Sequence, residues 1–572
     1  MPLSTKTKAL SLLRNILDTG RRTIERIPLR TKKPDCPERA IFSERSTPEE
    51  CGIPSRHVEC YFRELASCSE VGLQSIHILR FGKNLFTGAT GGLLCDTWKN
   101  CFSESKSVIS LAIGSLVRER KLNVKGRLVD YFDVKLPSVN YLRLSGITVE
   151  DLLTMRSTVS FSEADAMVSE DWITGFLSSE TSGEAGTTFK YNSMNSYMLA
   201  ALITRITGKS VSDYLRETIF GALGITDFYW ELSPDGIEKG GWGLYLFPDD
   251  LAKLGQLVLS GGVVSGKRLI SKKYLQSALS AGVIAPPSYG DFNYGYHMWY
   301  GRTQDKFLFN GMLGQNMLCY RNNGIIIVSN CGNGDLFQTN KFFEISDKYF
   351  SGDFPESIPD DEEAYDSLRQ AQYGLNRIPP KQIGIRIDDI PCGGSFSIVP
   401  RSRTAGSTGF APLMLQAIQN NYAKGLKRIT VAFEEGVANV TFEEVGEVYK
   451  VHFGLAEPLR ENVRIGEELF ELSNHASLAE NEDGIPVLKL STVFCEHPYK
   501  RVIRIVFDGD RITGYFSETP GADFGKKAVQ LIEKHIKQNR YFSSVYNKFD
   551  RDFLDAKVER AFSFNMPFEL SE

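Results

Sequence analysis

The chain has 572 residues, which is too long for a single hydrophobic core, so we expect two or more domains. Its hydrophobic share of 42% and charged share of 24% are typical of a soluble globular protein. The net charge of −4 gives no reason to expect a nucleic-acid partner.

Cysteines and histidines give no sign of a metal centre. The ten cysteines are scattered without a C-x-x-C pair, and the seven histidines are equally dispersed. We therefore expect no structural zinc, no other metal and no cofactor, and we interpret the cysteines as free thiols in a reducing compartment.

Membrane and export signals are also missing from the sequence. There is no apolar run of about 18 residues, the length that a membrane-spanning helix needs. The N-terminus lacks the apolar core and small-residue cleavage site of a signal peptide. These features predict a cytoplasmic protein.

Residues 1–44 form a basic N-terminal segment. The first 39 residues carry ten Lys or Arg against four Asp or Glu, and Leu10, Leu13 and Leu17 recur at near-helical spacing. Such a helix could contact an anionic membrane surface, but we favour a leading helix that packs on the main domain or frays.

Residues 45–350 alternate strand and helix patterns and predict the first domain. Two strand pairs, one early and one late, enclose the helical stretches, so we expect an α+β domain whose antiparallel sheet is closed by distant segments. The expected elements are strands around the turn in 75–86, helices at 107–117, 197–206 and 248–259, and a hairpin at 317–328 with Asn323 and Gly324 at its turn.

Residues 351–380 change character and predict a linker. Positions 353–366 are acidic and contain proline, and a short amphipathic stretch at 364–374 precedes Pro379 and Pro380. Beyond the linker, residues 381–572 contain short segments that alternate apolar and polar side chains between turns, as in 428–433 and 502–507. This pattern predicts a smaller β-rich domain, a sandwich or barrel with one or two helices.

A Ser-x-x-Lys tetrapeptide, Ser103 to Lys106, opens the helix expected at 107–117. Residues three positions apart share one face of a helix, so the lysine amine can reach the serine hydroxyl. The helix N-terminus would also direct N–H groups and positive dipole towards developing negative charge. These are the components of an activated serine nucleophile that needs no histidine.

Two further motifs follow in the chain. Tyr191 lies two positions before Ser193 at the start of the helix at 197–206, and a tyrosine there can relay a proton if a lysine lowers its pKa. Ser193 either contacts substrate or lysine, or simply caps the helix. Near the late hairpin, Gly311 would allow close backbone approach, while the Asn310 side chain contacts either substrate or its own loop.

The order Ser-x-x-Lys, Tyr-x-Ser and Gly-bearing strand resembles the serine β-lactamase and penicillin-binding-protein superfamily, above all its class C-type β-lactamase-related serine hydrolases. The resemblance extends to residues 147–155, which are similar to that family's ITxxxLLTM run. Residues 240–244 with 249–257 are similar to its GGxGL and DxAKxGQL segments. It covers roughly residues 45–350 and implies a β-lactamase/transpeptidase-like fold.

The resemblance also implies residue roles. Ser103 would be the nucleophile, Lys106 its proton acceptor or electrostatic partner, and Tyr191 the proton shuttle to the leaving group. Ser193 stands where many relatives carry Asn. The oxyanion hole would comprise the backbone N–H groups of Ser103 and Met312, with Asn310 and Gly311 completing the substrate-binding set.

One departure bears on the substrate. Relatives that bind penicillin carry Lys-Thr-Gly or His-Thr-Gly where this chain has Phe309-Asn310-Gly311, so a cation that helps to hold a substrate carboxylate is missing. With the missing export signal, this favours an intracellular serine hydrolase of a small ester, amide or short peptide. The alternatives are an inactive binding module of this fold, or a true β-lactamase or DD-peptidase.

Other candidate sites are weaker. Residues 405–409 imitate the A-x-S-x-G turn of a Ser-His-Asp hydrolase, but no well-placed Asp and His follow. His57, His77 and His297 are interpreted as packed or exposed rather than catalytic. The C-terminal domain resembles the lipocalin-like appendages of some relatives, which implies that it flanks or covers the cleft.

Overall fold

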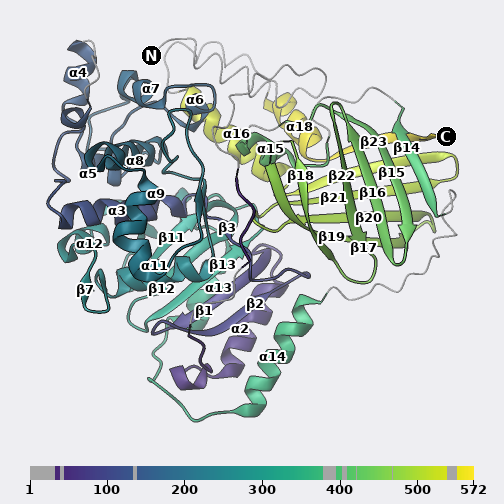
Figure 1. Ribbon diagram of the computed structural model, residues 1–572, viewed down its shortest axis with the longest axis horizontal. Coiled ribbons are helices and arrows are strands. Elements are labelled where there is room, and N and C mark those ends of the chain that lie inside the picture. Colours follow the sequence, from purple (N-terminus) through teal and green to yellow (C-terminus); the bar gives the residue numbers. More distant parts are fainter. Residues whose placement is uncertain are drawn as a thin grey trace.

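The computed structural model describes residues 33–38, 44–132, 138–377, 394–401, 409–419, 422–466, 468–537 and 551–571. An α+β region comes first in the chain, and a β-rich region follows beside it (Figure 1). The basic stretch at 1–32 and Ser407 of the A-x-S-x-G motif lie outside the described residues.

An eight-stranded antiparallel sheet forms the centre of the first region, in the order β2-β1-β13-β12-β11-β10-β9-β8. The early strand β1 pairs with the late strand β13, with Ile76 opposite Ser329, which confirms the expected closure by distant segments. The strands are β1 (Leu73–Arg80), β2 (Lys83–Ala89), β8 (Val283–Ile284), β9 (Phe292–Tyr294), β10 (Trp299–Gly301), β11 (Lys306–Gly311), β12 (Gln315–Tyr320) and β13 (Ile325–Cys331).

Helices cover both faces of this sheet, so its central strands are buried along their length. Helices α3 and α8 belong to the hydrophobic cluster on one face, and α2 and α13 to the cluster on the other. The helices are α2 (Ser55–Ser67), α3 (Glu104–Arg118), α4 (Ser138–Leu144), α5 (Val149–Leu153), α6 (Glu163–Ala166), α7 (Trp172–Ser178), α8 (Met194–Thr207), α9 (Val211–Leu215), α10 (Gly221–Leu223), α11 (Pro248–Leu259), α12 (Lys272–Ala278), α13 (Lys341–Phe350) and α14 (Glu362–Asn376).

Small sheets complete the first region. Strand β5 lies between β3 and β4, and β3 leads directly to Ser103. These strands are β3 (Lys99–Asn100), β4 (Tyr229–Trp230) and β5 (Leu244–Leu246), with a separate ribbon of β6 (Val263–Val264) and β7 (Lys267–Arg268).

Helix α14 occupies part of the segment expected to be a linker. Its buried side chains Leu368 and Ala371 lie three residues apart and therefore share one helical face. Gln372 donates a hydrogen bond from Nε2 to the carbonyl oxygen of Thr87, 2.5 Å away. The amphipathic stretch noticed at 364–374 thus packs on the first region beside α2 (Figure 1).

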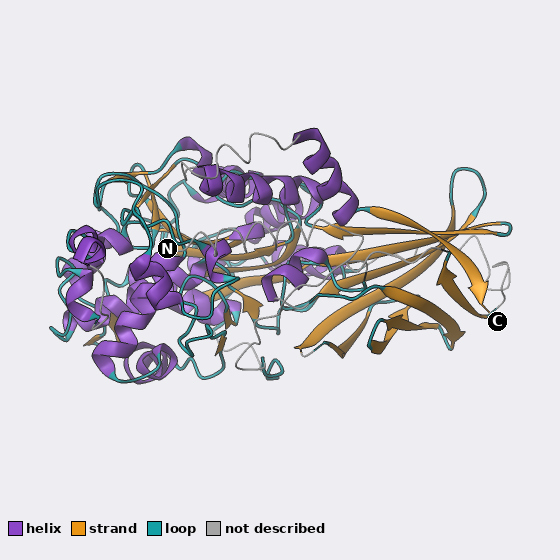
Figure 2. Ribbon diagram, turned by 90° about the horizontal axis from the view of Figure 1, so that it is seen from above, coloured by secondary structure: helices purple, strands orange, loops and turns teal. Residues whose placement is uncertain are grey.

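Ten antiparallel strands form the second region, which curls into a barrel (Figure 2). A single bridge between Gly454 and His475 joins β17 to β19 and brings the two ends of the sheet together. Side chains alternate between buried and exposed, as in β21 and β22, which is the pattern expected of strands with one face towards a core. The strands are β14 (Ser395–Pro400), β15 (Leu426–Glu434), β16 (Val437–Glu444), β17 (Glu447–Gly454), β18 (Leu459–Ile465), β19 (Glu468–Glu480), β20 (Pro486–Phe494), β21 (Lys500–Asp508), β22 (Arg511–Thr519) and β23 (Phe564–Ser571).

Helices α15 (Leu413–Gln419), α16 (Ala522–Lys537) and α18 (Arg551–Phe562) accompany the barrel. The predicted fold class, an α+β domain followed by a smaller β-rich domain, is confirmed. Over the described ranges, no helix combines the length and apolar character needed to cross a bilayer.

Candidate active site

Ser103 lies at the start of α3, directly after a tight turn that leaves strand β3. The Oδ1 atom of Asn100 accepts the backbone N–H of Phe102 at 3.0 Å and holds this turn. Phe102 adopts a left-handed backbone conformation with φ of 43°, which redirects the chain into the helix. Ser103 is half-buried, whereas the next residues of α3 are fully buried.

The amine of Lys106 contacts the hydroxyl of Ser103. Its Nζ donates to Ser103 Oγ at 2.7 Å and to the carbonyl oxygen of Gly241 at 2.8 Å. Burial lowers the pKa of Lys106 to about 7, against a smaller opposing effect of the Glu163 carboxylate. A large fraction of this lysine is therefore uncharged near neutral pH and can accept a proton.

Tyr191 completes a trio with these two residues. Its hydroxyl is hydrogen-bonded to the side chain of Ser103, and Lys106 Nζ lies 4.8 Å from the centroid of its ring. Burial raises the pKa of Tyr191 above its ordinary value, although the bond to Ser103 opposes the rise. The lysine therefore does not lower this pKa as the sequence argument allowed, and Tyr191 is a neutral phenol that can donate a proton.

Other aromatic rings surround Tyr191 and fix its orientation. Trp299 stacks on it with ring centroids 6.0 Å apart, and Tyr289 lies at 6.1 Å. Phe337 meets it edge-on at 5.7 Å. Tyr289 and Phe337 are half-buried, so an aromatic wall lies beside the Ser103–Tyr191 contact.

Ser193 is buried and its partner is Glu163, the first residue of α6. The Glu163 carboxylate accepts the Ser193 backbone N–H at 2.8 Å and also its hydroxyl. Although burial opposes ionisation, these bonds and the nearby Lys106 amine lower the pKa of Glu163. Ser193, which immediately precedes α8, is thus hydrogen-bonded to a charged carboxylate.

Sequence reasoning missed Glu163 and Gly241. Glu163 precedes its partner by 30 positions, and its local pattern signals only a helix start, Ser162 with Asp165 three residues later. Gly241 was noticed only as part of a family-like run. A Cβ atom there would lie 2.7 Å from Ser193 Cβ, so only glycine brings this carbonyl close enough to accept from Lys106.

The segment of β11 that contains Asn310 and Gly311 borders the nucleophile turn. A Cβ atom on Gly311 would lie 2.7 Å from the Cys101 carbonyl oxygen, so the glycine permits the expected close approach. The Asn310 side chain donates from Nδ2 to Asn316 Oδ1 at 2.8 Å on the paired strand and is only 4% exposed. Its amide is therefore engaged within the sheet.

The two backbone amides expected to form the oxyanion hole are those of Ser103, at the start of α3, and Met312, which follows β11. Outside the helices and strands of the described ranges, no backbone carbonyl accepts from the Ser103 or the Met312 amide. Phe102, which precedes Ser103, and Leu313, which follows Met312 and has φ of 66°, both have a left-handed backbone. A non-glycine left-handed residue therefore adjoins each of the two amides. Each such residue costs on the order of 1–2 kcal/mol, which the surrounding packing must offset.

His57, His77 and His297 contact partners other than Ser103. His297 is buried between Ser196, 2.8 Å from Nε2, and Tyr294, 3.3 Å from Nδ1. Burial, helped by the nearby Lys106 charge, lowers the pKa of His297 to about 3. His57 contacts the carbonyl oxygen of Tyr349, and His77 is buried in an ion pair with Asp249.

Part of the chain is similar to known proteins. Residues 75–335 match the family described as Beta-lactamase. The 6-aminohexanoate-dimer hydrolase of Paenarthrobacter ureafaciens is 24% identical over 225 residues, which are 36% of this chain and 56% of that protein. The match thus spans little more than half the length of this relative.

Solved structures also match the chain. A penicillin-binding protein from Bacillus halodurans is 17% identical with a TM-score of 0.40, covering 52% of this chain and 98% of that one. A D-amino acid amidase from Ochrobactrum anthropi SV3 is 18% identical with a TM-score of 0.41, covering 52% and 96%. The family match over residues 75–335 supports the resemblance of this region to the serine β-lactamase and penicillin-binding-protein superfamily.

Proposed function

We propose that this protein is a serine hydrolase that cleaves a small ester or amide through an acyl-enzyme at Ser103. The observation that carries the proposal is the 2.7 Å contact between Lys106 Nζ and Ser103 Oγ, at a lysine whose pKa burial lowers to about 7. An uncharged amine at hydrogen-bond distance from a hydroxyl is a competent general base.

In the first half-reaction, Lys106 takes the hydroxyl proton as Ser103 Oγ bonds to the carbonyl carbon of the substrate. The N–H groups of Ser103 and Met312 stabilise the negative oxygen of the tetrahedral intermediate. Tyr191 donates its proton to the leaving oxygen or nitrogen as that bond breaks, and the Lys106 ammonium restores the proton to Tyr191. The products are an acyl-serine and a free alcohol or amine.

In the second half-reaction, water or another nucleophile attacks the acyl-serine with the same groups in reversed roles. Glu163 acts indirectly in both halves, because it holds Ser193 and with it the start of α8. Its negative charge also lies close enough to Lys106 to affect the lysine pKa.

The environment of Asn310 supports an ester or amide substrate over a penicillin. The position that carries the cation in penicillin-binding relatives is Phe309 here, and it is fully buried. The Asn310 amide is engaged by Asn316. Neither side chain offers a positive charge for the carboxylate of a β-lactam or a D-Ala-D-Ala terminus. The cytoplasmic location stays a prediction from the sequence.

Two reagents test the proposal. The protein should react with a fluorophosphonate probe and hydrolyse p-nitrophenyl acetate, and Ser103→Ala should lose both activities while keeping the wild-type circular-dichroism spectrum. A folded wild-type protein that neither labels nor turns over would instead be a binding module. Nitrocefin hydrolysis as fast as ester hydrolysis would identify a β-lactamase and contradict the substrate preference.

A further inference from the structure

The backbone of the candidate oxyanion hole is held by strained residues. Phe102 precedes the Ser103 amide and Leu313 follows Met312, and both have left-handed φ angles, 43° and 66°. Residues with a Cβ atom rarely adopt this conformation, so their surroundings must impose it. The packing of the Phe102 side chain therefore determines the orientation of the peptide plane that carries the Ser103 N–H, while Leu313 constrains the backbone that follows Met312.

The C-terminal barrel supplies this packing. Phe102 is 3% exposed and Leu313 is fully buried, and both belong to a hydrophobic cluster whose other buried members lie in the second region, between Phe396 and Phe568. Tyr499 meets the Phe102 ring edge-on, with centroids 6.4 Å apart and planes at 90°. The side chain that packs on the nucleophile turn, Tyr499, thus lies almost 400 positions later in the chain.

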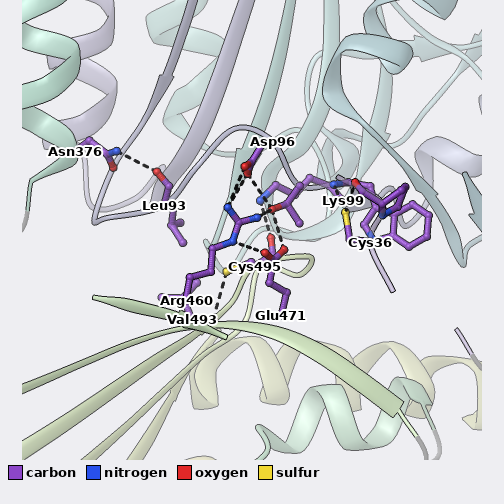
Figure 3. A network of polar contacts seen from close by, with 12 residues as sticks. Cys36, Leu93, Asp96, Lys99, Asn376, Arg460, Glu471, Val493 and Cys495 are labelled. Atoms are coloured by element: carbon purple, nitrogen blue, oxygen red, sulfur yellow. Dashed lines mark hydrogen bonds and ion pairs between the residues drawn. The ribbon is translucent and has the colours of Figure 1, made fainter. Parts of the chain in front are cut away.

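Hydrogen bonds attach the same part of the barrel to strand β3. Two backbone carbonyl groups in the turn between β20 and β21 accept hydrogen bonds from the first region. The Cys495 carbonyl accepts from Lys99 Nζ at 2.6 Å, and the Glu496 carbonyl accepts from the backbone N–H of Asn100 at 2.9 Å. Figure 3 shows Lys99 and Cys495 at this boundary. Because the Asn100 side chain holds the Phe102 amide, this turn supports the nucleophile turn through hydrogen bonds as well as through packing.

We propose that Tyr499 is a positioning residue for acylation, which keeps Phe102 in its left-handed conformation and so aims the Ser103 amide at the substrate oxygen. This inference rests on the proposed function. Without the Tyr499 ring, Phe102 can relax towards an ordinary φ angle, which turns the Ser103 N–H away. The transition state then loses one of its two oxyanion donors, whereas the aromatic wall beside Tyr191 is unchanged.

The Tyr499 hydroxyl provides a conservative control. Among the described residues it has no hydrogen-bond partner, so Tyr499→Phe removes no bond and should keep the wild-type acylation rate. Tyr499→Leu stays apolar but loses the edge contact with Phe102. It should slow acylation by a p-nitrophenyl ester at least ten-fold, towards the roughly 10²–10³ that loss of one oxyanion donor costs in kcat. The substrate concentration that half-saturates the acylation phase should stay within about two-fold, since the substrate-binding groups are intact.

A matched variant separates positioning from general loss of the barrel core. Phe507 is 2% exposed, and its ring contacts that of Phe396 in the same barrel. Phe507 lies eight positions after Tyr499 in the chain, which corresponds to about 26 Å along an extended strand. Phe507→Leu should lower the melting temperature as Tyr499→Leu does, yet keep kcat within about two-fold of wild type.

The outcomes are separable. Slow acylation in Tyr499→Leu alone, with wild-type rates in Tyr499→Phe and Phe507→Leu, would support the proposal. Equal rates in all three variants, or equal losses in both leucine variants, would overturn it. A wild-type protein without any acylation would refute the proposed function instead. If Tyr499→Leu fails to fold, Tyr499→Trp, which keeps an aromatic ring but alters its contact, is assayed against Phe507→Trp under the same criteria.

Discussion

At the residue scale, the proposed chemistry depends on the charge of Lys106. This amine is 1% exposed and is bonded to one hydroxyl and one carbonyl oxygen, neither of which carries a full charge. Burial without a directly bonded anion disfavours the ammonium form, so the pKa falls to about 7. The same surroundings raise the pKa of Tyr191. The same buried environment therefore favours an uncharged Lys106, which can accept a proton, beside a neutral Tyr191, which can donate one.

The first prediction concerns pH. Only uncharged Lys106 accepts the Ser103 proton, so kcat/KM for a neutral ester should rise about ten-fold per pH unit well below 7 and level off above it. Tyr191 adds no descending limb below about pH 9, because its pKa is raised. Stopped-flow acylation between pH 5 and 9 measures this profile. A rate that falls as pH increases through 7 would contradict the role of Lys106.

The second prediction separates the Tyr191 hydroxyl from its ring. Tyr191→Phe keeps the stacking on Trp299 but removes the proton donor. Turnover of an ester with a poor leaving group should fall by about 10²-fold or more, whereas a p-nitrophenyl ester, whose leaving group needs no proton, should be affected much less. Steady-state kinetics on the two esters measure this difference. Equal losses on both esters would indicate that the hydroxyl acts elsewhere.

At the element scale, the site lies where β11, α3 and α8 meet, and each approach depends on a local backbone feature. Gly311 allows β11 to reach the Cys101 carbonyl, and Gly241 allows its own carbonyl to reach Lys106. Phe102 turns the chain from β3 into α3. The positions of these elements, rather than their individual stability, determine the geometry.

The third prediction tests the approach of β11. Gly311→Ala places a Cβ atom 2.7 Å from the Cys101 carbonyl oxygen, and this backbone atom cannot move without displacing the nucleophile turn. We expect ester turnover to fall at least ten-fold, with fluorophosphonate labelling slowed in parallel. Gly334→Ala is the control, because a Cβ atom there meets no heavy atom within 4 Å. Wild-type kinetics in Gly311→Ala would contradict the close contact.

Sequence patterns predicted the elements more completely than the site. The helix expected at 248–259 is α11 with the same bounds, because proline starts it and its apolar positions follow the helical period. Ser103, Lys106 and Tyr191 were identified because their order along the chain is distinctive. The roles proposed for Glu163 and Tyr499 were not predicted from the sequence. Each depends on a partner 30 or more positions away, and no local pattern encodes such a contact.

At the scale of the whole molecule, the two regions share a polar and apolar boundary. Arg460 on β18 reaches across it to Asp96, with Nη1 and Oδ1 2.8 Å apart, and also binds Glu471 and Thr97 (Figure 3). Deeper in, Lys33 pairs with Glu496 at 2.8 Å, both side chains being buried. The expectation that the barrel flanks or covers the cleft stays a prediction, and the limits of 45–350 and 381–572 for the two domains remain a proposal.

The fourth prediction tests the Arg460 network. Arg460→Ala and Asp96→Ala should each lower the free energy of unfolding by roughly 1 kcal/mol, because the arginine is only partly exposed. The double variant should lose less than the sum of the two single losses, because both remove the same pair. Urea unfolding of the four proteins provides the cycle. Strict additivity would show that the two side chains do not interact across the boundary.

The central claim is that Ser103 forms the acyl-enzyme, and peptide mass spectrometry of the trapped adduct tests it most directly. The intact protein is mixed with an activated ester, quenched in acid within the first turnover and digested. The acyl mass should lie on the peptide that contains Ser103, at a stoichiometry approaching one, and Lys106→Met should abolish it. An adduct on another residue, or an equal adduct in Ser103→Ala, would contradict the account.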